Sequence, residues 1–587
     1  MIKNIYQYNR MILFSGVLLI LAASSCRKGF LEKPQGSDTT VDSIFSSSEK
    51  VQYAIAQAYT QSLAIGITII PWDWNRDYCM RESTLDGISG ENMPTDFDWE
   101  DAWIIQRSGM TADDGSGVPR SEDGFSFNYK AIRQNYLVQE NIAKVRDMAE
   151  VEKAQVRAEM KVLTAYRYSE MFKRYGGVPI VEKTLNISDT LNIPRASLQA
   201  TLDLIVKLCD AAVDSLPDAY PEKWKGRITK GVALAVKAEA LMYAARPLFN
   251  AAAPYMDLGS HNSFICFGNR DASRWQQAAD AAKAALDWSL ANGYHVLNTG
   301  DPLDDFGTAT STPGNAEILL AYKYQWGNDV GALFFLYNLH TWVGNANGMS
   351  FTQLQQFYKV NGSDQVWADE NPRPYSEYYS KMQEMEARLK VSIQAPGIDA
   401  WSNPNDAYWN SVNCFQSGNL GREECGRRAK FWYKAGTREW FEFPLYRVAE
   451  FYLDLAEAYN ELSQPAQALS YLNVIRQRAG LPAVVETDQD ALRKIIQREW
   501  AIEFYQENHR LHDVKHWKLP DIADGIIGGA KRSFTFTYAG SSAAVPTDFL
   551  TYSNVVKYNG FWSTNQYLCP FPASEVNKGY LVQNPGY

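Results

Sequence analysis

Apolar residues that recur at the helical period are the feature that most constrains how this chain can fold. Hydrophobic side chains return every three or four positions in many segments, which is typical of helices with one buried face. The segments are Ser48–Leu63, Tyr129–Ala149, Val151–Tyr175, Leu198–Ser215, Thr229–Phe249, Ser273–Asn292, Tyr446–Leu462, Pro465–Ala479 and Gln489–Trp517. The pattern predicts a mainly α-helical fold, in which neighbours such as Tyr129–Ala149 and Val151–Tyr175 form antiparallel pairs.

Small side chains indicate that these helices pack closely. The segment Thr229–Phe249 is rich in alanine, and small residues let helix axes approach each other. Near the C-terminus, small and large residues alternate across two adjacent segments, Leu453/Ala456/Tyr459 and Ala468/Leu469/Leu472. This alternation is similar to that of tetratricopeptide repeats. The sequence therefore predicts a scaffold of tetratricopeptide-like helical pairs with few short strands.

Two long regions lack helical periodicity, at about residues 65–127 and 293–442. Both are rich in Gly, Asn, Asp, Pro and aromatic residues. Loops of this length are usually functional or disordered, and the aromatic content argues against disorder. We interpret them as irregular lobes on the helical scaffold. Because no Ser/Gly/Pro-rich linker divides the chain, residues 41–587 are expected to form a single domain.

The N-terminus has the layout of an export signal. Lys3 and Arg10 precede an apolar run from Met11 to Ala23, and small residues follow up to Cys26. The run is too short to cross a bilayer comfortably. It resembles the lipobox of bacterial lipoproteins, in which the chain is cut before the cysteine and lipid is attached to it. Residues 1–25 are then removed, Cys26 carries the lipid, and residues 26–40 form a tether. A plain signal peptide with an incidental cysteine is the alternative.

Charge and cysteine usage exclude several classes of protein. The chain of 587 residues has 57 Lys and Arg against 67 Asp and Glu, a net charge of −10, and no long basic run. A nucleic-acid-binding protein would need a concentrated positive patch. No CxxC pair occurs, which argues against a zinc ribbon or a thioredoxin-like motif. Cys209, on an apolar helix face, is expected to be a buried free thiol, and whether Cys414 and Cys425 form a disulfide is left open.

Separated motifs along the chain resemble those of one known family. They are the start Cys26-Arg27-Lys28-Gly29-Phe30-Leu31-Glu32-Lys33-Pro34, the helix with Ala165-Tyr166-Arg167-Tyr168 that leads to Arg174-Tyr175-Gly176-Gly177-Val178-Pro179, the segment with Arg498-Glu499, Glu503, Arg510, Asp513 and Trp517, and the end Pro570-Phe571-Pro572 to Gln583-Asn584-Pro585-Gly586-Tyr587. They resemble, in the same order, motifs of the SusD/RagB family of surface glycan-binding lipoproteins in Bacteroidetes-type bacteria.

The resemblance implies a location and a partner. Members of the family sit at the outer membrane and cover a SusC-like TonB-dependent transporter, to which they pass a ligand without chemical turnover. A lipid anchor would hold the chain at the membrane, and no cofactor is expected. Members displayed outside the cell often have acidic residues soon after the lipidated cysteine. Here Arg27 and Lys28 follow it, so outward or periplasmic display stays open.

Charged residues near the C-terminus suggest a structural network. Glu499, Glu503, Arg510 and Asp513 fall on the motif-bearing segment Gln489–Trp517. Buried ion pairs are a common cause of such clusters. We expect these four residues to clamp the last helix to the scaffold.

Aromatic residues mixed with polar ones mark candidate glycan-binding positions. Flat aromatic rings pack on the apolar faces of sugars, while Asp, Asn, Gln and Arg bind their hydroxyl groups. In the first lobe the candidates are Trp72, Asp73, Trp74, Asn75, Arg81 and Trp99, with Trp103 nearby; in the second they are Trp326, Asn328 and Trp342. Each tryptophan could instead fill the core under a long loop.

Enzymatic interpretations find less support in the sequence. No nucleophile elbow, HExxH motif, Walker loop or dinucleotide fingerprint occurs. His509, His512 and His516 share one face of a predicted helix, so a zinc site is conceivable, against packing histidines as the plainer interpretation. We therefore expect a non-enzymatic glycan-binding protein. A peptide or other nutrient binder of the same transport system, and a surface glycoside hydrolase with a cryptic carboxylate pair, are the alternatives.

Overall fold

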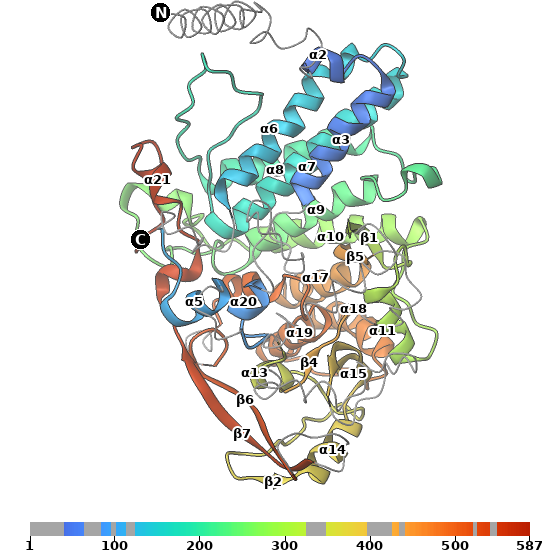
Figure 1. Cartoon of the computed structure of the whole chain (residues 1–587), viewed down its shortest axis with the longest axis vertical. Coiled ribbons are helices and arrows are strands. Elements are labelled where there is room, and N and C mark those ends of the chain that lie inside the picture. Colours follow the sequence, from blue (N-terminus) through green and yellow to red (C-terminus); the bar gives the residue numbers. More distant parts are fainter. Residues whose placement is uncertain are drawn as a thin grey trace, which may run out of the picture.

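The computed structural model describes residues 40–63, 84–94, 101–112, 124–324, 348–395, 425–431, 433, 441–519, 525–539 and 549–587. Helices dominate, as the periodicity predicts, and strands are few (Figure 1). In this view the helices of residues 48–63 and 125–245 occupy the upper part, and those of residues 448–517 lie lower. Within the described residues, none of the helices has the length and apolar composition needed to cross a membrane.

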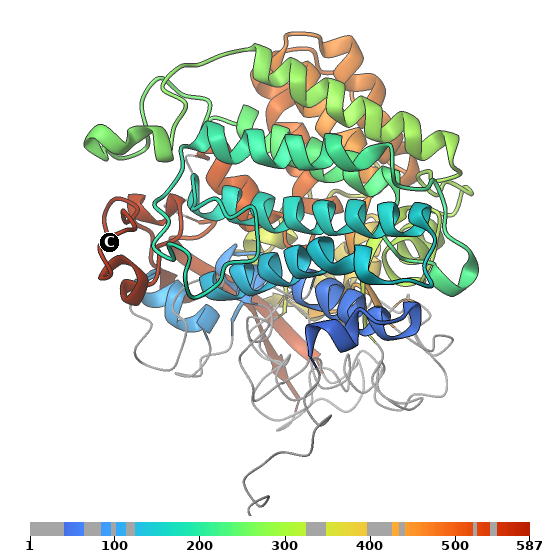
Figure 2. The ribbon, with the colours of Figure 1, turned by 90° about the horizontal axis from the view of Figure 1, so that it is seen from above.

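The N-terminal half is a succession of packed helices. Their bounds are α2 Val41–Ile44, α3 Ser48–Leu63, α4 Thr84–Ile88, α5 Asp101–Ser108, α6 Phe125–Asn141, α7 Glu150–Tyr175, α8 Leu198–Val213, α9 Lys230–Ala245 and α10 Ser273–Ala291, with 3₁₀ turns η1 Ile142–Lys144, η2 Glu222–Trp224 and η3 Gly259–Phe264. Each of α6 to α9 packs on the next helix in order, and α3 packs on both α6 and α7. Viewed from above, they lie side by side from blue to green (Figure 2).

The C-terminal half continues this packing and adds the strands. Its elements are α11 Pro302–Ser311, β1 Ile318–Tyr324, α13 Phe351–Leu354, β2 Arg373–Pro374, α14 Tyr375–Gln383, α15 Ala387–Ser392, β3 Ile393–Gln394, β4 Arg427–Arg428, β5 Phe441–Arg447, α17 Val448–Glu461, α18 Pro465–Arg478, α19 Gln489–Glu503, α20 Arg510–Trp517, β6 Gly529–Tyr538, β7 Phe549–Gly560, η8 Thr564–Tyr567 and α21 Ala573–Val576. Helix α17 joins the two halves, because it packs on α10, α18 and α19.

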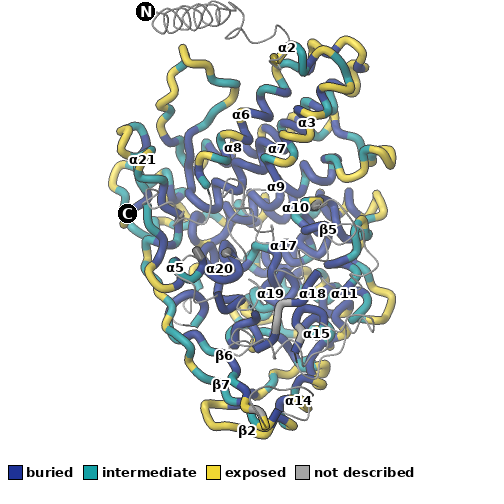
Figure 3. Tube along the Cα trace, in the orientation of Figure 1, coloured by how far each residue is buried: buried dark blue, intermediate teal, exposed yellow. Residues whose placement is uncertain are grey.

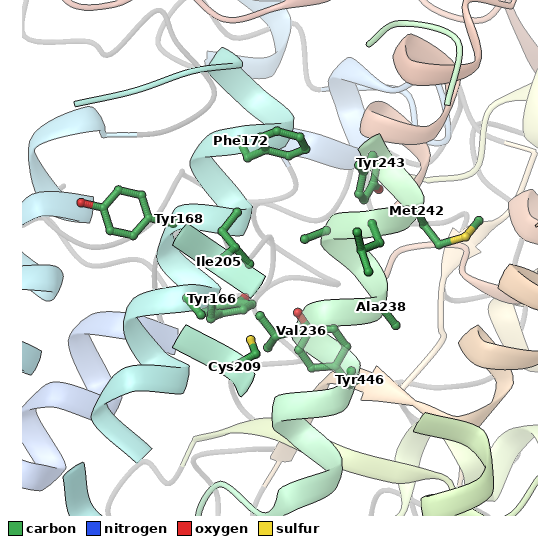
Figure 4. Packing of buried hydrophobic residues seen from close by; sticks show 14 of the residues in the cluster. Tyr166, Tyr168, Phe172, Ile205, Cys209, Val236, Ala238, Met242, Tyr243 and Tyr446 are labelled. Atoms are coloured by element: carbon green, nitrogen blue, oxygen red, sulfur yellow. The ribbon is translucent and has the colours of Figure 1, made fainter. Parts of the chain in front are cut away.

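One apolar core runs through the helical layers. Where α7, α8 and α9 meet, Phe172, Ile205 and Val236 are fully buried among the aromatic rings around them (Figure 4). Buried positions follow the helix interiors, and exposed positions gather at loop tips and near β2 (Figure 3). Cys209 lies in this core as a buried free thiol, which confirms the prediction for it. Burial raises the pKa of that thiol, so it stays protonated.

Predicted helix bounds agree with the structure where a clear end signal exists. Helix α3 has the predicted bounds, and α7, α8, α10, α17 and α18 differ by one or two residues. Helix α9 ends at Ala245 rather than Phe249, because Pro247 disfavours the helical conformation in the residue before it.

Two predicted helices were wrong in their extent. The segment Tyr129–Ala149 forms α6, which begins at Phe125 and ends at Asn141, followed by η1. The segment Gln489–Trp517 is two helices, α19 and α20, rather than one. The turn between them places Gln506 and Asn508 at φ values of 63° and 67°, a conformation that no glycine or proline announces in the sequence.

Strands are few, as predicted, but two of them are longer than the short strands that were expected. Strands β6 and β7 form a long antiparallel hairpin in a three-stranded sheet of order β2-β7-β6, which runs down one side of the molecule (Figure 1). Alternating residues such as Phe534 and Phe536 point to the core, a period-two pattern that the helical reading of the sequence missed. The described parts of the two regions expected to be irregular also contain regular elements, among them α5, α11 and α14.

Candidate functional site

The residues predicted to bind glycan lie outside the described residues. Trp72, Asp73, Trp74, Asn75 and Arg81 fall within residues 64–83, Trp99 within 95–100, and Trp326, Asn328 and Trp342 within 325–347. Cys26 also falls outside, as does Cys414 of the possible disulfide. Their roles stay predictions. The structure instead describes the places where the chain enters and leaves these segments.

Described residues that flank several such segments meet at one point. The backbone N–H of Met93 donates to the carbonyl of Gly348 at 2.8 Å, and that of Ser350 donates to Glu91 at 2.9 Å. On its other side, Met349 exchanges backbone hydrogen bonds with Gly426 at 2.8 Å and Cys425 at 3.0 Å. We call residues 90–93, 348–350 and 425–426 the root junction. The junction residues directly follow segments 325–347 and 396–424, lie just before segment 95–100, and come seven residues after segment 64–83, so they join both predicted lobes at one point.

The root junction is buried and fits closely against its neighbours. Met349 and Cys425 are fully buried, and Asn92 is 1% exposed. Gly90 has φ +80°, and a Cβ atom there would lie 1.9 Å from the carbonyl oxygen of Ile526. Any other residue at this position would therefore clash with the backbone that leads into β6.

Polar contacts hold the root junction on the turn between α19 and α20. The hydroxyl of Tyr505 donates to Asn92 at 2.6 Å, and the backbone N–H of Gln506 donates to the Glu91 carboxyl at 3.1 Å. Burial, and then the neighbouring Asp86, raise the pKa of Glu91 well above its usual value. The junction is thus fixed by non-local hydrogen bonds rather than by helix packing.

An ion-pair cluster lies next to that turn. It consists of Glu317, Glu386, Glu499, Glu503 and Glu507 with Arg388, Lys430, Arg447, Arg476 and Arg478, so the charges balance. Glu503 pairs with Arg478, with Arg447 at 3.1 Å and with Arg388 at 3.4 Å. Burial opposes ionisation of Glu503, but these arginines lower its pKa overall. The predicted network is confirmed for Glu499 and Glu503, although their partners come from other elements.

The last helix is clamped separately to the scaffold. Asp513 of α20 pairs with Arg246 at 2.7 Å and accepts a hydrogen bond from Tyr243 of α9 at 3.1 Å. This part of the predicted network is also confirmed. Arg510 is buried and interacts electrostatically with Glu91 and with Asp513 of the predicted network, although it forms no direct ion pair with another described residue.

The upstream ends of two segments are held close to a second anchor. Helix α3 leads into segment 64–83, and its Tyr59 donates to the buried carboxylate of Glu159 at 2.7 Å. Tyr220 donates to the same carboxylate at 2.6 Å, and Arg227 pairs with it at 2.7 Å. Gly226 in this loop packs against Lys323 of β1, which leads into segment 325–347.

This second anchor carries aromatic residues that the sequence analysis missed. The guanidinium of Arg227 lies 5.2 Å from the ring centre of Tyr220 and 5.4 Å from that of Trp224, and both rings are half-buried. The loop Asp218–Gly226 combines aromatic, charged and turn residues in the way the chosen candidates do. The loop lies between two periodic helical segments and outside the two regions interpreted as lobes. Trp103, by contrast, packs against Tyr558 of β7 with ring centres 5.0 Å apart.

A shallow bowl of about 740 Å³ borders the root junction. Its wall includes Phe351, directly after the junction, together with Glu370, Arg532 and Asn554. Glu370 and Arg532 form an ion pair at 3.0 Å. The bowl offers groups that bind hydroxyls, and among the described residues that line it Phe351 is the one aromatic residue.

The histidines are packing residues. The His516 ring lies 4.7 Å from the rings of both Tyr243 and Phe249, and its Nε2 is 2.9 Å from the carbonyl of Lys173. Burial lowers the pKa of His516 to about 3 and that of His512 well below its usual value. His509 precedes α20 rather than lying within one long helix. Among the described residues, no cluster of His, Cys, Asp or Glu could hold a metal ion.

Comparisons with known proteins agree with this architecture. A family model described as "SusD family" matches residues 315–587, and one described as "Starch-binding associating with outer membrane" matches residues 30–241. The chain belongs to the SusD/RagB family. The description of the second model names starch binding and association with the outer membrane.

Individual relatives show the same fold at low identity. A SusD-like protein, P38, of Formosa agariphila is 22% identical over 385 residues, which are 63% of this chain and 68% of the relative. A crystal structure of a SusD-like protein from Bacteroides fragilis has a TM-score of 0.70 and 21% identity, covering 93% of this chain and 98% of its own. A laminarin-binding SusD-like protein has a TM-score of 0.55 and 17% identity, covering 92% and 100%.

Proposed function

We propose that this protein binds a glycan on its two lobes at the cell surface and delivers it to a SusC-like TonB-dependent transporter, without catalysis. The observation that carries the proposal is the root junction, because it joins residues of the two lobes, such as Met93 and Gly348, that are more than 200 positions apart in the sequence. Aromatic residues from both lobes can therefore serve one binding surface.

Chain length limits how far the candidate residues can lie from the junction. Trp99 follows Pro94 by five residues, and Trp342 precedes Gly348 by six. An extended chain covers at most about 3.5 Å per residue, so these two chain lengths allow a reach of roughly 20 Å from the junction. An extended polysaccharide can bridge such distances. Indole faces and nearby Asp, Asn and Arg side chains suit sugar rings and hydroxyls.

Delivery requires a surface for the transporter, and the helical scaffold offers one. A groove of about 560 Å³ crosses α8, α9 and α10. Leu202, Val206 and Leu234 give it an apolar floor, and Lys207 and Asp280 stand at its rim. An apolar floor with a charged rim is typical of protein interfaces, and stacked helix pairs present broad faces. This groove is our candidate for the contact with the transporter.

The anchor follows from the N-terminal pattern. Lipid on Cys26 would hold the chain at the outer membrane, with residues 26–40 as a tether before α2. Changing Cys26 to Ala is expected to move the protein from the membrane fraction to the soluble fraction. Unchanged fractionation would remove the anchor from the proposal.

The binding experiment uses the mature protein and a panel of plant, host and microbial polysaccharides in affinity gels. Trp72→Ala, Trp74→Ala and Trp326→Ala are each expected to weaken retardation with an unchanged unfolding temperature. Tyr53→Ala, an aromatic truncation at a residue that is 77% exposed on α3, is the matched control. Equal retardation of all three variants and the wild type would refute the site.

The same samples separate binding from hydrolysis. Release of sugar products by the purified protein would favour the glycoside hydrolase, which needs two carboxylates at a fixed separation. Retardation by no polysaccharide, together with binding of peptides, would favour a peptide-binding member of the same transport system. Retention without product is the outcome that we expect.

A further inference from the structure

A separate cavity of about 440 Å³ lies within the helical scaffold. Trp275 at the start of α10, Asn460 of α17, Arg493 and Gln497 of α19, and Trp517 at the end of α20 line it, together with Arg270 before α10. The cavity is therefore built mainly from helices rather than loops, and helices position side chains more precisely. Its volume is in the range of small-molecule sites.

Two indole rings form the apolar part of the cavity. Trp275 and Trp517 are each 7% exposed. The Trp517 ring is fixed in place, because its N–H donates to Glu457 at 2.7 Å and the guanidinium of Arg246 lies 4.9 Å from its ring centre. A rigid aromatic surface loses little conformational entropy when a ligand packs on it.

Several polar residues that line the cavity are held in place by contacts within the protein. Arg493 pairs with both Glu461 and Asp490. The side-chain amide of Asn460 donates to the backbone of Gln489 at 3.0 Å, and the Gln489 amide donates back to the Asn460 backbone at 2.7 Å. These contacts fix carboxylate oxygens beside a guanidinium, an arrangement that suits hydroxyl groups.

Other polar groups at the cavity have unused hydrogen-bonding capacity. The guanidinium of Arg270, the carboxamide of Gln497 and the indole N–H of Trp275 make no hydrogen bond with another described residue. The charges around the cavity sum to zero: three are positive, on Arg246, Arg270 and Arg493, and three are negative, on Glu457, Glu461 and Asp490. A neutral ligand rich in hydroxyls, with one apolar face, matches this set of groups.

We infer that this cavity binds a neutral saccharide of one or two units. Its ring packs on the indoles of Trp275 and Trp517. Its hydroxyls form hydrogen bonds with Arg270, with Gln497 and with the carboxylates that pair with Arg493. The inference takes its ligand class from the function proposed above, but it uses none of the residues on the lobes.

The test titrates the mature protein with maltose, cellobiose and laminaribiose by calorimetry. At least one disaccharide is expected to bind saturably, and the double variant Arg270→Ala/Gln497→Ala is expected to lose at least tenfold in affinity. Because Arg270 is exposed and Gln497 is half-buried, the double variant should fold normally. Lys144→Ala, at an exposed residue of η1 that does not line the cavity, is the control and should bind like the wild type.

Measurements on the lobe variants separate this cavity from the lobe site. Trp74→Ala and Trp326→Ala should keep disaccharide binding at this cavity, whatever they do to retention on polysaccharide gels. Trp275→Phe should reduce the change in tryptophan fluorescence on saturation. Absence of saturable binding, or binding that survives Arg270→Ala/Gln497→Ala, would overturn the inference, as would binding lost in the lobe variants. If polysaccharide retention fails in the wild type, the proposed function fails while the titration still decides this site.

Discussion

The helical stack and the ion-pair cluster next to the root junction are stabilised by different interactions. We call this cluster the charged base. Between α7, α8 and α9, apolar and small side chains such as Phe172 and Ala238 fill the space between helices. Beneath the junction, Glu503 and its arginine partners carry charges deep in the protein. In an apolar core the cost of a substitution grows with the change in side-chain volume. A buried charge that loses its partner is strongly destabilising. The lobes are therefore expected to depend on the charged base more than on the stack.

The largest effect is expected at the charged base. Glu503→Ala leaves Arg447 and Arg478 buried without this carboxylate, which should lower the free energy of unfolding by about 3–5 kcal/mol. Denaturant unfolding measures it. The control is Glu182→Ala, whose exposed pair with Lys207 should matter by less than about 1 kcal/mol. Equal effects of the two variants would remove the distinction between base and surface.

Acid should weaken the same base. Because the folded pKa of Glu503 is lowered overall, its contribution to stability is full above its unfolded pKa of about 4.5 and is lost as the pH falls toward the folded value. Wild-type unfolding free energy should therefore fall on acidification below about pH 4.5, and Glu503→Ala should show a smaller fall. Parallel pH profiles would contradict this account.

Gly90 tests the root junction itself. An alanine there would have an unfavourable φ and a Cβ close to the carbonyl oxygen of Ile526, so Gly90→Ala should cost at least about 2 kcal/mol. Gly90→Ala is expected to weaken glycan retention while the helical stack remains folded. Gly259→Ala, at a positive-φ glycine with open space around it, is the control for backbone strain alone. Normal glycan affinity in folded Gly90→Ala would separate the junction from binding.

The helical stack should respond more mildly. Ala238→Leu adds bulk to the fully buried face of α9, and overpacking of this kind costs about 1–3 kcal/mol. Where the variant remains folded, its glycan affinity should equal that of the wild type. A loss of affinity as large as that of Gly90→Ala would mean that stack and junction are one cooperative unit.

The smallest effect is expected at a carboxyl pair on α17. Glu450 and Asp454 lie one helical turn apart, each 2% exposed, and burial raises the pKa of both. A raised folded pKa gives stability that is full below about pH 4.5 and is lost as the pH rises toward the folded value. Glu450→Gln/Asp454→Asn should therefore flatten the decline of the unfolding free energy between pH 5 and 8. A steeper decline in the variant would contradict the assignment.

The sequence predicted what short-range patterns encode. Helix α3 has its predicted bounds because its apolar residues repeat within one segment, and the same signal located the other scaffold helices. The turn at Gln506 and the root junction depend on contacts between residues hundreds of positions apart, such as Tyr505 with Asn92. No local pattern announces such contacts. The aromatic candidates on the lobes rest on composition and family resemblance, and they stay predictions.

A double-mutant cycle between the lobes tests the central claim most directly. Trp74→Ala, Trp326→Ala and the double variant are compared for affinity toward the best polysaccharide by calorimetry. If both residues contact one bound chain, each single variant should weaken the same binding event, and the double variant should lose at least about the sum of the two losses with no second binding event left. A loss from one lobe only, or a separate binding event that survives in a single variant with wild-type affinity, would contradict a single glycan site shared by two lobes that meet at the root junction.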